Sequence, residues 1–82
     1  MKFAVATDVQ GSKTRVVVSA LDDDEQFLNN QAMTGTVLGP DLKPITLDIE
    51  QTGPGRYVGE FDSSKPGSYM VMVTPGAGQA MI

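Results

Sequence analysis

The chain has 82 residues, contains neither cysteine nor histidine, and carries a formal net charge of −4 from six basic and ten acidic residues. Without cysteine or histidine it cannot form a disulfide, a thiolate nucleophile, a cysteine-ligated zinc site or a catalytic triad with an imidazole base. It also has no lysine or arginine run to supply the basic surface that nucleic acid or anionic lipid requires, so we expect neither as a partner.

The length predicts one domain over residues 1–82, folded around a single small core. No apolar run approaches the ~20 residues of a transmembrane helix, so we expect no direct membrane insertion. Residues 1–10 lack the apolar core of a signal peptide, and any targeting signal is expected outside this segment. Nine glycines, five prolines and short β-branched runs favour an all-β fold.

Residues 2–9 and 14–21 alternate in polarity, which predicts two strands joined by a turn at Gln10-Gly11-Ser12. The positions predicted to face the core are Phe3, Val5, Thr7 and Val9 in the first strand and Val16, Val18 and Ala20 in the second. Residues 22–31 then carry four consecutive acids and two asparagines. This composition predicts a long loop that crosses between two sheets, with Phe27 packed over the edge of the core.

Two further strands are predicted in residues 32–50. Residues 32–38 form the first, and Pro40 and Asp41 are suited to the centre of a type I turn after it. In the second, Ile45, Leu47 and Ile49 alternate with Thr46, Asp48 and Glu50. We expect one continuous strand with one solvent-exposed face, ended by Gly53-Pro54-Gly55.

The stretch 55–74 contains two alternating strands on either side of a turn-forming run at residues 62–68. In this run Pro66 fixes φ and Gly67 permits a positive φ. Tyr69 follows directly, in the setting of a tyrosine corner, where the ring packs in the core and the hydroxyl bonds to backbone near the turn. We therefore interpret Pro66, Gly67 and Tyr69 as structural residues. A short last strand is expected at residues 79–82.

About seven short strands at this spacing predict a two-sheet antiparallel sandwich, with a closed barrel as the alternative. The segments PGRYVGEF (residues 54–61) and PGSYMVMV (residues 66–73), preceded by Gly39-Pro40-Asp41, resemble bacterial immunoglobulin-like modules of large envelope proteins. Similar signatures occur in macroglobulin-type and fibronectin-type sandwiches. They also occur in modules that accompany von Willebrand A-like or glutamine-amidotransferase-like domains of bacterial membrane proteins.

The resemblance implies an immunoglobulin-like sandwich that forms one module of a longer protein. It also implies a scaffold or protein-interaction role, and a location in the cell envelope on the periplasmic or extracellular side. Any catalysis in such a protein would belong to a neighbouring domain. The residue content of this chain also argues against a catalytic site, because serine-based hydrolysis would need a lysine base, and Lys13 and Lys65 are predicted in solvated turns. We therefore expect no enzyme, no catalytic residue and no cofactor.

The acidic run at residues 22–25 is the one candidate for metal binding, because calcium takes six to eight oxygen ligands. An EF-type register fails, since Phe27 and Met33 occupy its glycine and final glutamate positions. We favour a solvated acidic loop. The alternative is a ligand-binding module that uses residues 22–30, either for calcium through Asp22 and Asp24 with Asn29 or Asn30, or for carbohydrate. The chain has no tryptophan, and its five aromatic residues are predicted at core or core-edge positions.

Met70 and Met72 fall on the strand face opposite Tyr69, and form the candidate interaction surface. Together with Val17 and Val58 they are expected to make an apolar patch on the outer faces. A last strand of only four residues would also leave the edge of the strand at residues 69–74 open. The expected partners are neighbouring domains of the parent chain or another protein, with a homo-oligomer through this edge as a further prediction.

Overall fold

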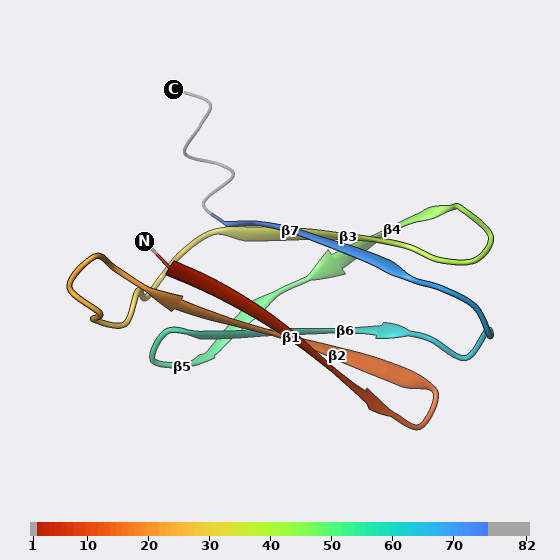
Figure 1. The fold of residues 1–82 in the computed structure, drawn as a ribbon, viewed down its shortest axis with the longest axis horizontal. Helices are drawn as coiled ribbons and strands as arrows, with labels where there is room; N and C mark the ends of the chain where they lie inside the picture. Colours follow the sequence, from red (N-terminus) through yellow and green to blue (C-terminus); the bar gives the residue numbers. More distant parts are fainter. Residues whose placement is uncertain (1, 76–82) are drawn as a thin grey trace.

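The computed structural model describes residues 2–75, which form seven strands in two antiparallel sheets. The four-stranded sheet has the order β1-β2-β6-β5 and the three-stranded sheet the order β4-β3-β7. The strands are β1 (Lys2–Gln10), β2 (Lys13–Leu21), β3 (Met33–Leu38), β4 (Pro44–Asp48), β5 (Glu50–Gly53), β6 (Arg56–Asp62) and β7 (Met70–Pro75). Figure 1 shows the three-stranded sheet lying over the four-stranded one, so the predicted all-β sandwich is confirmed. The described residues include no helix long and apolar enough to cross a membrane.

The core lies between the two sheets and draws on both. Its buried apolar side chains are Val16, Val18, Ala20, Met33, Val37, Leu47, Tyr57 and Phe61. The predicted inner face of the second strand is confirmed, because Val16, Val18 and Ala20 are fully buried. The connection between β2 and β3 crosses from one sheet to the other, as the acidic loop was predicted to do.

The predicted fourth strand, residues 45–50, is in fact two strands that belong to different sheets. β4 pairs with β3, whereas β5 pairs with β6, and Ile49 lies between them. Ile45, predicted to face the core, is 44% exposed, whereas Leu47 is buried. The alternating pattern continues up to the switch because Leu47 of β4 and Ile49, at the switch itself, both pack in the same core. Side-chain alternation therefore does not reveal which sheet the backbone joins.

Two glycines allow this strand to pass close to the core. A methyl group at Gly59 would lie 2.7 Å from the carbonyl oxygen of Asp48. One at Gly35 would lie 3.0 Å from Cβ of Leu47. The absence of a side chain at both positions lets Leu47 and the backbone around it settle against β3 and β6.

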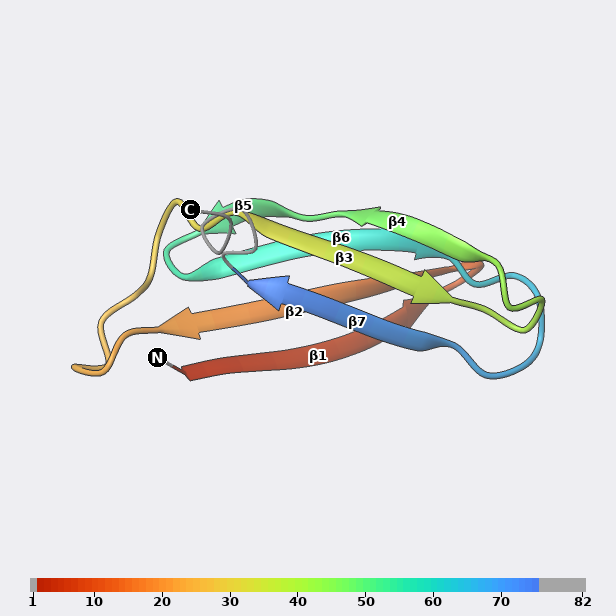
Figure 2. The ribbon, with the colours of Figure 1, turned by 90° about the horizontal axis from the view of Figure 1, so that it is seen from above.

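The two long sides of the sandwich differ (Figure 2). We call the side of β4 and β5 the closed side, because the chain runs from one sheet into the other there. The opposite side is formed by β1 and β7, which pair in the described residues only with β2 and β3, and we call it the open side. The split of the fourth strand brings the observed number of strands to seven. The strand predicted at residues 79–82 lies outside the described residues.

Candidate functional site

The acidic loop is held in shape by its own first acid. Oδ1 of Asp22 accepts hydrogen bonds from the backbone N–H groups of Asp24 (2.8 Å) and Gln26 (2.9 Å). The carboxylate of Glu25 pairs with Nζ of Lys2 at 3.0 Å. Within residues 2–75, no three acidic side chains are grouped so that they could hold a metal ion. The structure thus places the candidate ligands Asp22 and Asp24 in one loop but does not gather them into a coordination site.

The asparagines proposed as further calcium ligands tie the loop to the closed side instead. Oδ1 of Asn29 accepts hydrogen bonds from Nε2 of Gln51 (2.8 Å) and from the backbone N–H of Gly55 (3.0 Å). The backbone N–H of Asn30 donates to Oε1 of Gln51 at 2.9 Å. Gly55 has φ of +62° and closes the turn between β5 and β6. These contacts give the asparagines a role in positioning the loop.

Tyr57 of β6 holds the backbone of the same loop through its buried hydroxyl, a role that the sequence pattern did not identify. Its side chain is 1% exposed, and its hydroxyl donates to the carbonyl of Leu28 at 2.8 Å and accepts from the backbone N–H of Gln31 at 3.1 Å. Leu28 packs against the core, whereas Phe27 is 62% exposed. The prediction that Phe27 covers the core edge is therefore wrong, because Tyr57 fixes the backbone so that Leu28 fills this place.

The corner before β7 docks onto the turn between β3 and β4. Gly67 has φ of +136°, and a methyl group there would lie 2.7 Å from Cγ of Pro40. Pro66 precedes it, and the hydroxyl of Tyr69 donates to the carbonyl of Lys65 at 2.6 Å. The Tyr69 ring packs against the core, with its centroid 5.6 Å from that of Phe61. This is the geometry that a tyrosine corner describes.

Two exposed carboxylates at this end have lowered pKa values. For Asp62 the main cause is the hydrogen bond from the Ser64 hydroxyl, followed by the bond from the Ser64 backbone N–H at 2.8 Å. For Asp41 the main cause is the hydrogen bond from the backbone N–H of Lys43 at 3.2 Å. The positive charge of Lys65 also lowers the pKa of Asp41, since its Nζ lies 3.7 Å from Oδ2. Both carboxylates therefore act as turn caps.

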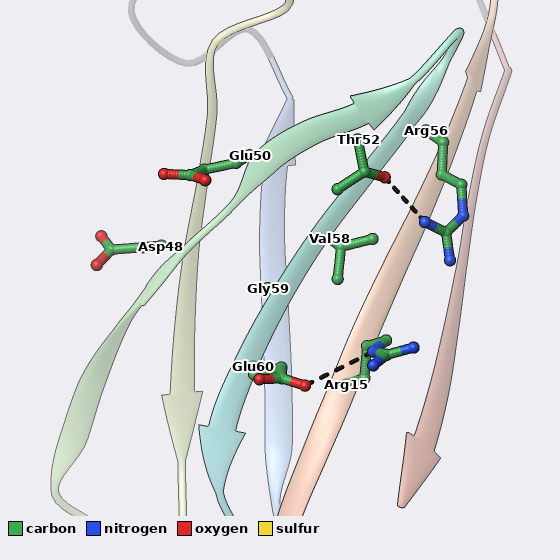
Figure 3. Close-up of a pocket in the computed structure, with 8 residues that line it drawn as sticks. All are labelled: Arg15, Asp48, Glu50, Thr52, Arg56, Val58, Gly59 and Glu60. Atoms are coloured by element: carbon green, nitrogen blue, oxygen red, sulfur yellow. Dashed lines mark hydrogen bonds and ion pairs between the residues drawn. The ribbon is translucent and has the colours of Figure 1, made fainter. Parts of the chain in front are cut away.

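A hollow of about 440 Å³ lies over β5, β6 and the neighbouring part of β2 (Figure 3). It is lined by Arg15, Asp48, Glu50, Thr52, Arg56, Val58, Gly59 and Glu60. Nη1 of Arg56 donates to the hydroxyl of Thr52 at 2.8 Å, and Nε of Arg15 lies 3.6 Å from the Glu60 carboxylate. The only hydroxyl among these lining residues is bonded to a guanidinium rather than to a base. The hollow therefore does not pair a hydroxyl nucleophile with a base, although the carboxylates of Asp48, Glu50 and Glu60 line it.

On the open side, the inner face of β1 is only partly covered. Phe3 and Val5 pair with Ala20 and Val18 of β2 and share their face of the sheet. Ala20 and Val18 are fully buried, whereas Phe3 is 36% and Val5 is 52% exposed. Val9, on the same face, is 70% exposed, so the whole inner face of β1 is poorly covered, and Figure 2 shows β7 crossing β1 obliquely rather than running along it. We call Phe3 and Val5 the β1 ledge.

The outer faces do not form the predicted four-residue patch. Val17 and Val58 pair with each other on the four-stranded sheet, whereas Met70 and Met72 belong to β7 of the other sheet. The two pairs face away from the core on opposite surfaces of the sandwich, so that prediction is wrong. Met70 and Met72 are 58% and 46% exposed and lie on the open side.

Exposed apolar side chains gather on the open side. The large ones among the described residues are Phe3, Val5, Val9, Phe27, Leu42, Ile45, Met70 and Met72. Five of these eight belong to β1 and β7, the two strands of the open side. These exposures also correct the prediction for the aromatic residues, because Phe3 and Phe27 are exposed, whereas Tyr57 and Phe61 are buried and Tyr69 packs at the core edge.

The edges of the sheets differ in charge. β1 carries Lys2 and Asp8, β4 carries Asp48, and β5 carries Glu50. β7, with the sequence MVMVTP, carries no charged side chain. Charged residues on edge strands discourage pairing with other chains, so β7 is the least protected edge of the sandwich.

No protein-family model matches this chain, and no curated protein matches it in sequence. Any role for the protein is therefore inferred from the geometry of its surfaces and from the resemblance of residues 54–61 and 66–73.

Proposed function

We propose that this chain is a non-catalytic structural or protein-interaction module that makes its contacts through the open side. The concentration of exposed apolar side chains on β1 and β7 is the observation that supports this role. Single exposed apolar residues are ordinary on a protein surface, but a set gathered beside an uncharged strand edge is typical of a contact surface. The non-catalytic part of the proposal is supported by the lack of histidine and cysteine in the sequence, and by the one hydroxyl of the hollow, that of Thr52, which is bonded to Arg56 rather than to a base.

The proposed setting is a larger bacterial envelope protein, on its periplasmic or extracellular side. Its support is the resemblance of residues 54–61 and 66–73 to immunoglobulin-like modules of such proteins. The partner would be a neighbouring domain of the parent chain or another protein, and a second copy of the module is a further candidate.

The alternative, a calcium or carbohydrate module that uses residues 22–30, has less support. Oxygens of Asp22 and Asn29 already accept two hydrogen bonds each from within the protein. We expect millimolar calcium to leave the melting temperature unchanged. A calcium-dependent rise that Asp24→Asn abolishes would favour the alternative, because ligand that binds only the folded state stabilises it by mass action.

Site-specific photocrosslinking in cells that make the protein tests the proposal. A photoreactive amino acid placed at Met72 on the open side should give a defined adduct with a partner, whereas the same group at Glu50, on exposed β5 of the closed side, should not. Fractionation of the same cells should recover the adduct with the envelope. Equal adducts from both positions, or none from Met70, Met72 and Val5, would contradict the proposal.

A further inference from the structure

We propose that the open side binds one extended strand of a partner protein, which pairs with the free edge of β7 and packs alternate apolar side chains on the β1 ledge. This inference rests on the proposed interaction role and specifies its surface and the chemistry of its partner. It draws on three independent features: the backbone of β7, the partly covered face of β1, and the charge of the sheet edges.

The backbone of β7 is the first feature. β7 is bonded along its whole length to β3, from the pair Leu38 and Met70 to the pair Met33 and Pro75. In an antiparallel ladder, alternate residues of such a strand direct their N–H and C=O groups to the opposite edge. On that edge no described strand pairs with β7. These groups are therefore a template for one added strand.

The β1 ledge is the second feature. A strand added beside β7 would give the three-stranded sheet four strands, the same number as the sheet it covers. Val71 and Val73 face the core from β7, so alternate residues of the added strand would face the same interior, on the side where Phe3 and Val5 are exposed. Figure 2 shows this part of β1 lying beside β7 on the open side.

Charge is the third feature, and it defines the chemistry of the partner. Neither the β7 strand nor the β1 ledge carries a charged side chain, whereas each of the other three edge strands does. A charged residue directed at the ledge would lose its hydration without gaining an ionic partner. The occupant is therefore an uncharged segment of about six residues, the length of β7, with β-branched or other apolar residues at alternate positions.

Within residues 2–75, a second copy of this chain offers no free strand of this kind. Its one uncharged edge strand in these residues is β7, and the inner residues Val71 and Val73 of that strand are already packed against its own core. They could not also cover the ledge of another molecule. An extended segment of a different protein can present one face to the ledge and its backbone to β7 at the same time.

NMR titration of the whole 82-residue chain tests the inference. The probe is a blocked synthetic peptide with three valines alternating with three threonines, flanked by a lysine at each end. We expect it to shift the amide signals of β7 and of the ledge residues, and to slow hydrogen exchange at alternate β7 amides. The matched control has the same composition with N-methyl groups on alternate backbone nitrogens, which remove the donors needed for pairing, and should cause no such shifts.

Two neighbouring substitutions test the ledge. Val5→Asp places a charge on the inner face of β1 and should weaken peptide binding at least about tenfold, a free-energy change of roughly 1.4 kcal/mol. Ala4→Asp places the same charge on the outer face and should leave the affinity unchanged. Val5→Ala, which keeps the site uncharged, should weaken binding about threefold and guards against an unfolded Asp variant.

Three results would overturn the inference. One is an unchanged β7 spectrum at millimolar peptide. Another is slow exchange of alternate β7 amides in the free monomer, which would mean that the chain itself occupies the edge. The third is a concentration-dependent dimer that protects this edge, which would assign it to a second copy. If crosslinks form at Met72 while the peptide and Val5→Asp have no effect, the interaction role stands and the strand-pairing inference fails.

Discussion

The closed and open sides of the sandwich differ in how the apolar residues beside their sheet edges are covered. Both sides end in sheet edges, yet on the closed side the chain itself passes from β4 into β5 and joins the two sheets. On the open side β1 and β7 are separate strands, and the β1 ledge remains partly exposed. The comparison teaches that the chain passing between the sheets covers the apolar residues beside the switch, Leu47 and Ile49, whereas the unconnected strands of the open side leave Phe3 and Val5 exposed for other contacts.

The largest effect is expected from crowding the closed side. Gly59→Ala should destabilise the fold by about 3 kcal/mol, because the new methyl group would lie 2.7 Å from the carbonyl oxygen of Asp48, a backbone atom that cannot easily move. Gly53→Ala is the control, since nothing lies within 4 Å of its methyl position. Urea denaturation followed by fluorescence measures both. Equal midpoints for the two variants would mean that the backbone at Asp48 can move away from the new methyl group without loss of stability.

A second pair of variants compares the sides directly. Val18 and Val5 pair across β2 and β1 on one face of the sheet, but Val18 is fully buried and Val5 is 52% exposed. Val18→Ala should cost about 2 kcal/mol through lost burial and the cavity that remains, whereas Val5→Ala should cost less than about 0.5 kcal/mol. Calorimetry of the monomer gives both values. A cost for Val5→Ala close to that for Val18→Ala would show that the ledge is covered in solution.

Removing the hydroxyl of the buried Tyr57 should destabilise the protein more than removing that of the half-buried Tyr69. Tyr57→Phe removes one donor and one acceptor from the partly buried backbone of the acidic loop, and should cost about 1–2 kcal/mol. Tyr69→Phe frees the Lys65 carbonyl, which can bond to water instead because this contact is exposed, and should cost less than about 1 kcal/mol. Denaturation midpoints, with amide exchange of Leu28 and Gln31, give the ranking. A larger cost at Tyr69 would make the corner, rather than the loop anchor, the stronger support.

Side-chain alternation was sufficient to predict most of the strands and the core face of β2. It could not locate the sheet switch at Ile49, because a strand that changes sheets around one core keeps the same in-and-out pattern. It also placed Phe3 and Val5 in the core, since a sequence pattern identifies the face of a strand but not whether another strand covers that face.

The candidate site could also be predicted only in part, because alternation gives the face of a strand but not the sheet that the strand joins. Met70 and Met72 follow from alternation alone, but their separation from Val17 and Val58 depends on which sheet each strand joins. The anchoring role of Tyr57 depends on a hydrogen bond between residues 29 positions apart. Such a bond leaves no periodic signal in the sequence, and only the tertiary arrangement brings the two groups together.

The smallest effect is expected at the corner that leads from β6 to the open side. The Ser64 hydroxyl and backbone N–H hold the pKa of Asp62 below its ordinary value. A lowered folded-state pKa stabilises the protein above the unfolded pKa, and this contribution is lost as the pH falls through the folded value. The stability difference between wild type and Asp62→Asn should therefore be constant from neutral pH to about pH 5 and shrink below about pH 4.

Ser64→Ala identifies the cause of this pH dependence. It removes the hydroxyl donor, the larger contribution, and keeps the backbone N–H. The pKa of Asp62, followed by the chemical shift of its carboxyl carbon, should then rise part of the way to its ordinary value. An unchanged pKa would mean that the backbone N–H alone caps the turn. In that case the corner should keep its acid response in any variant that leaves the backbone between β6 and β7 in place.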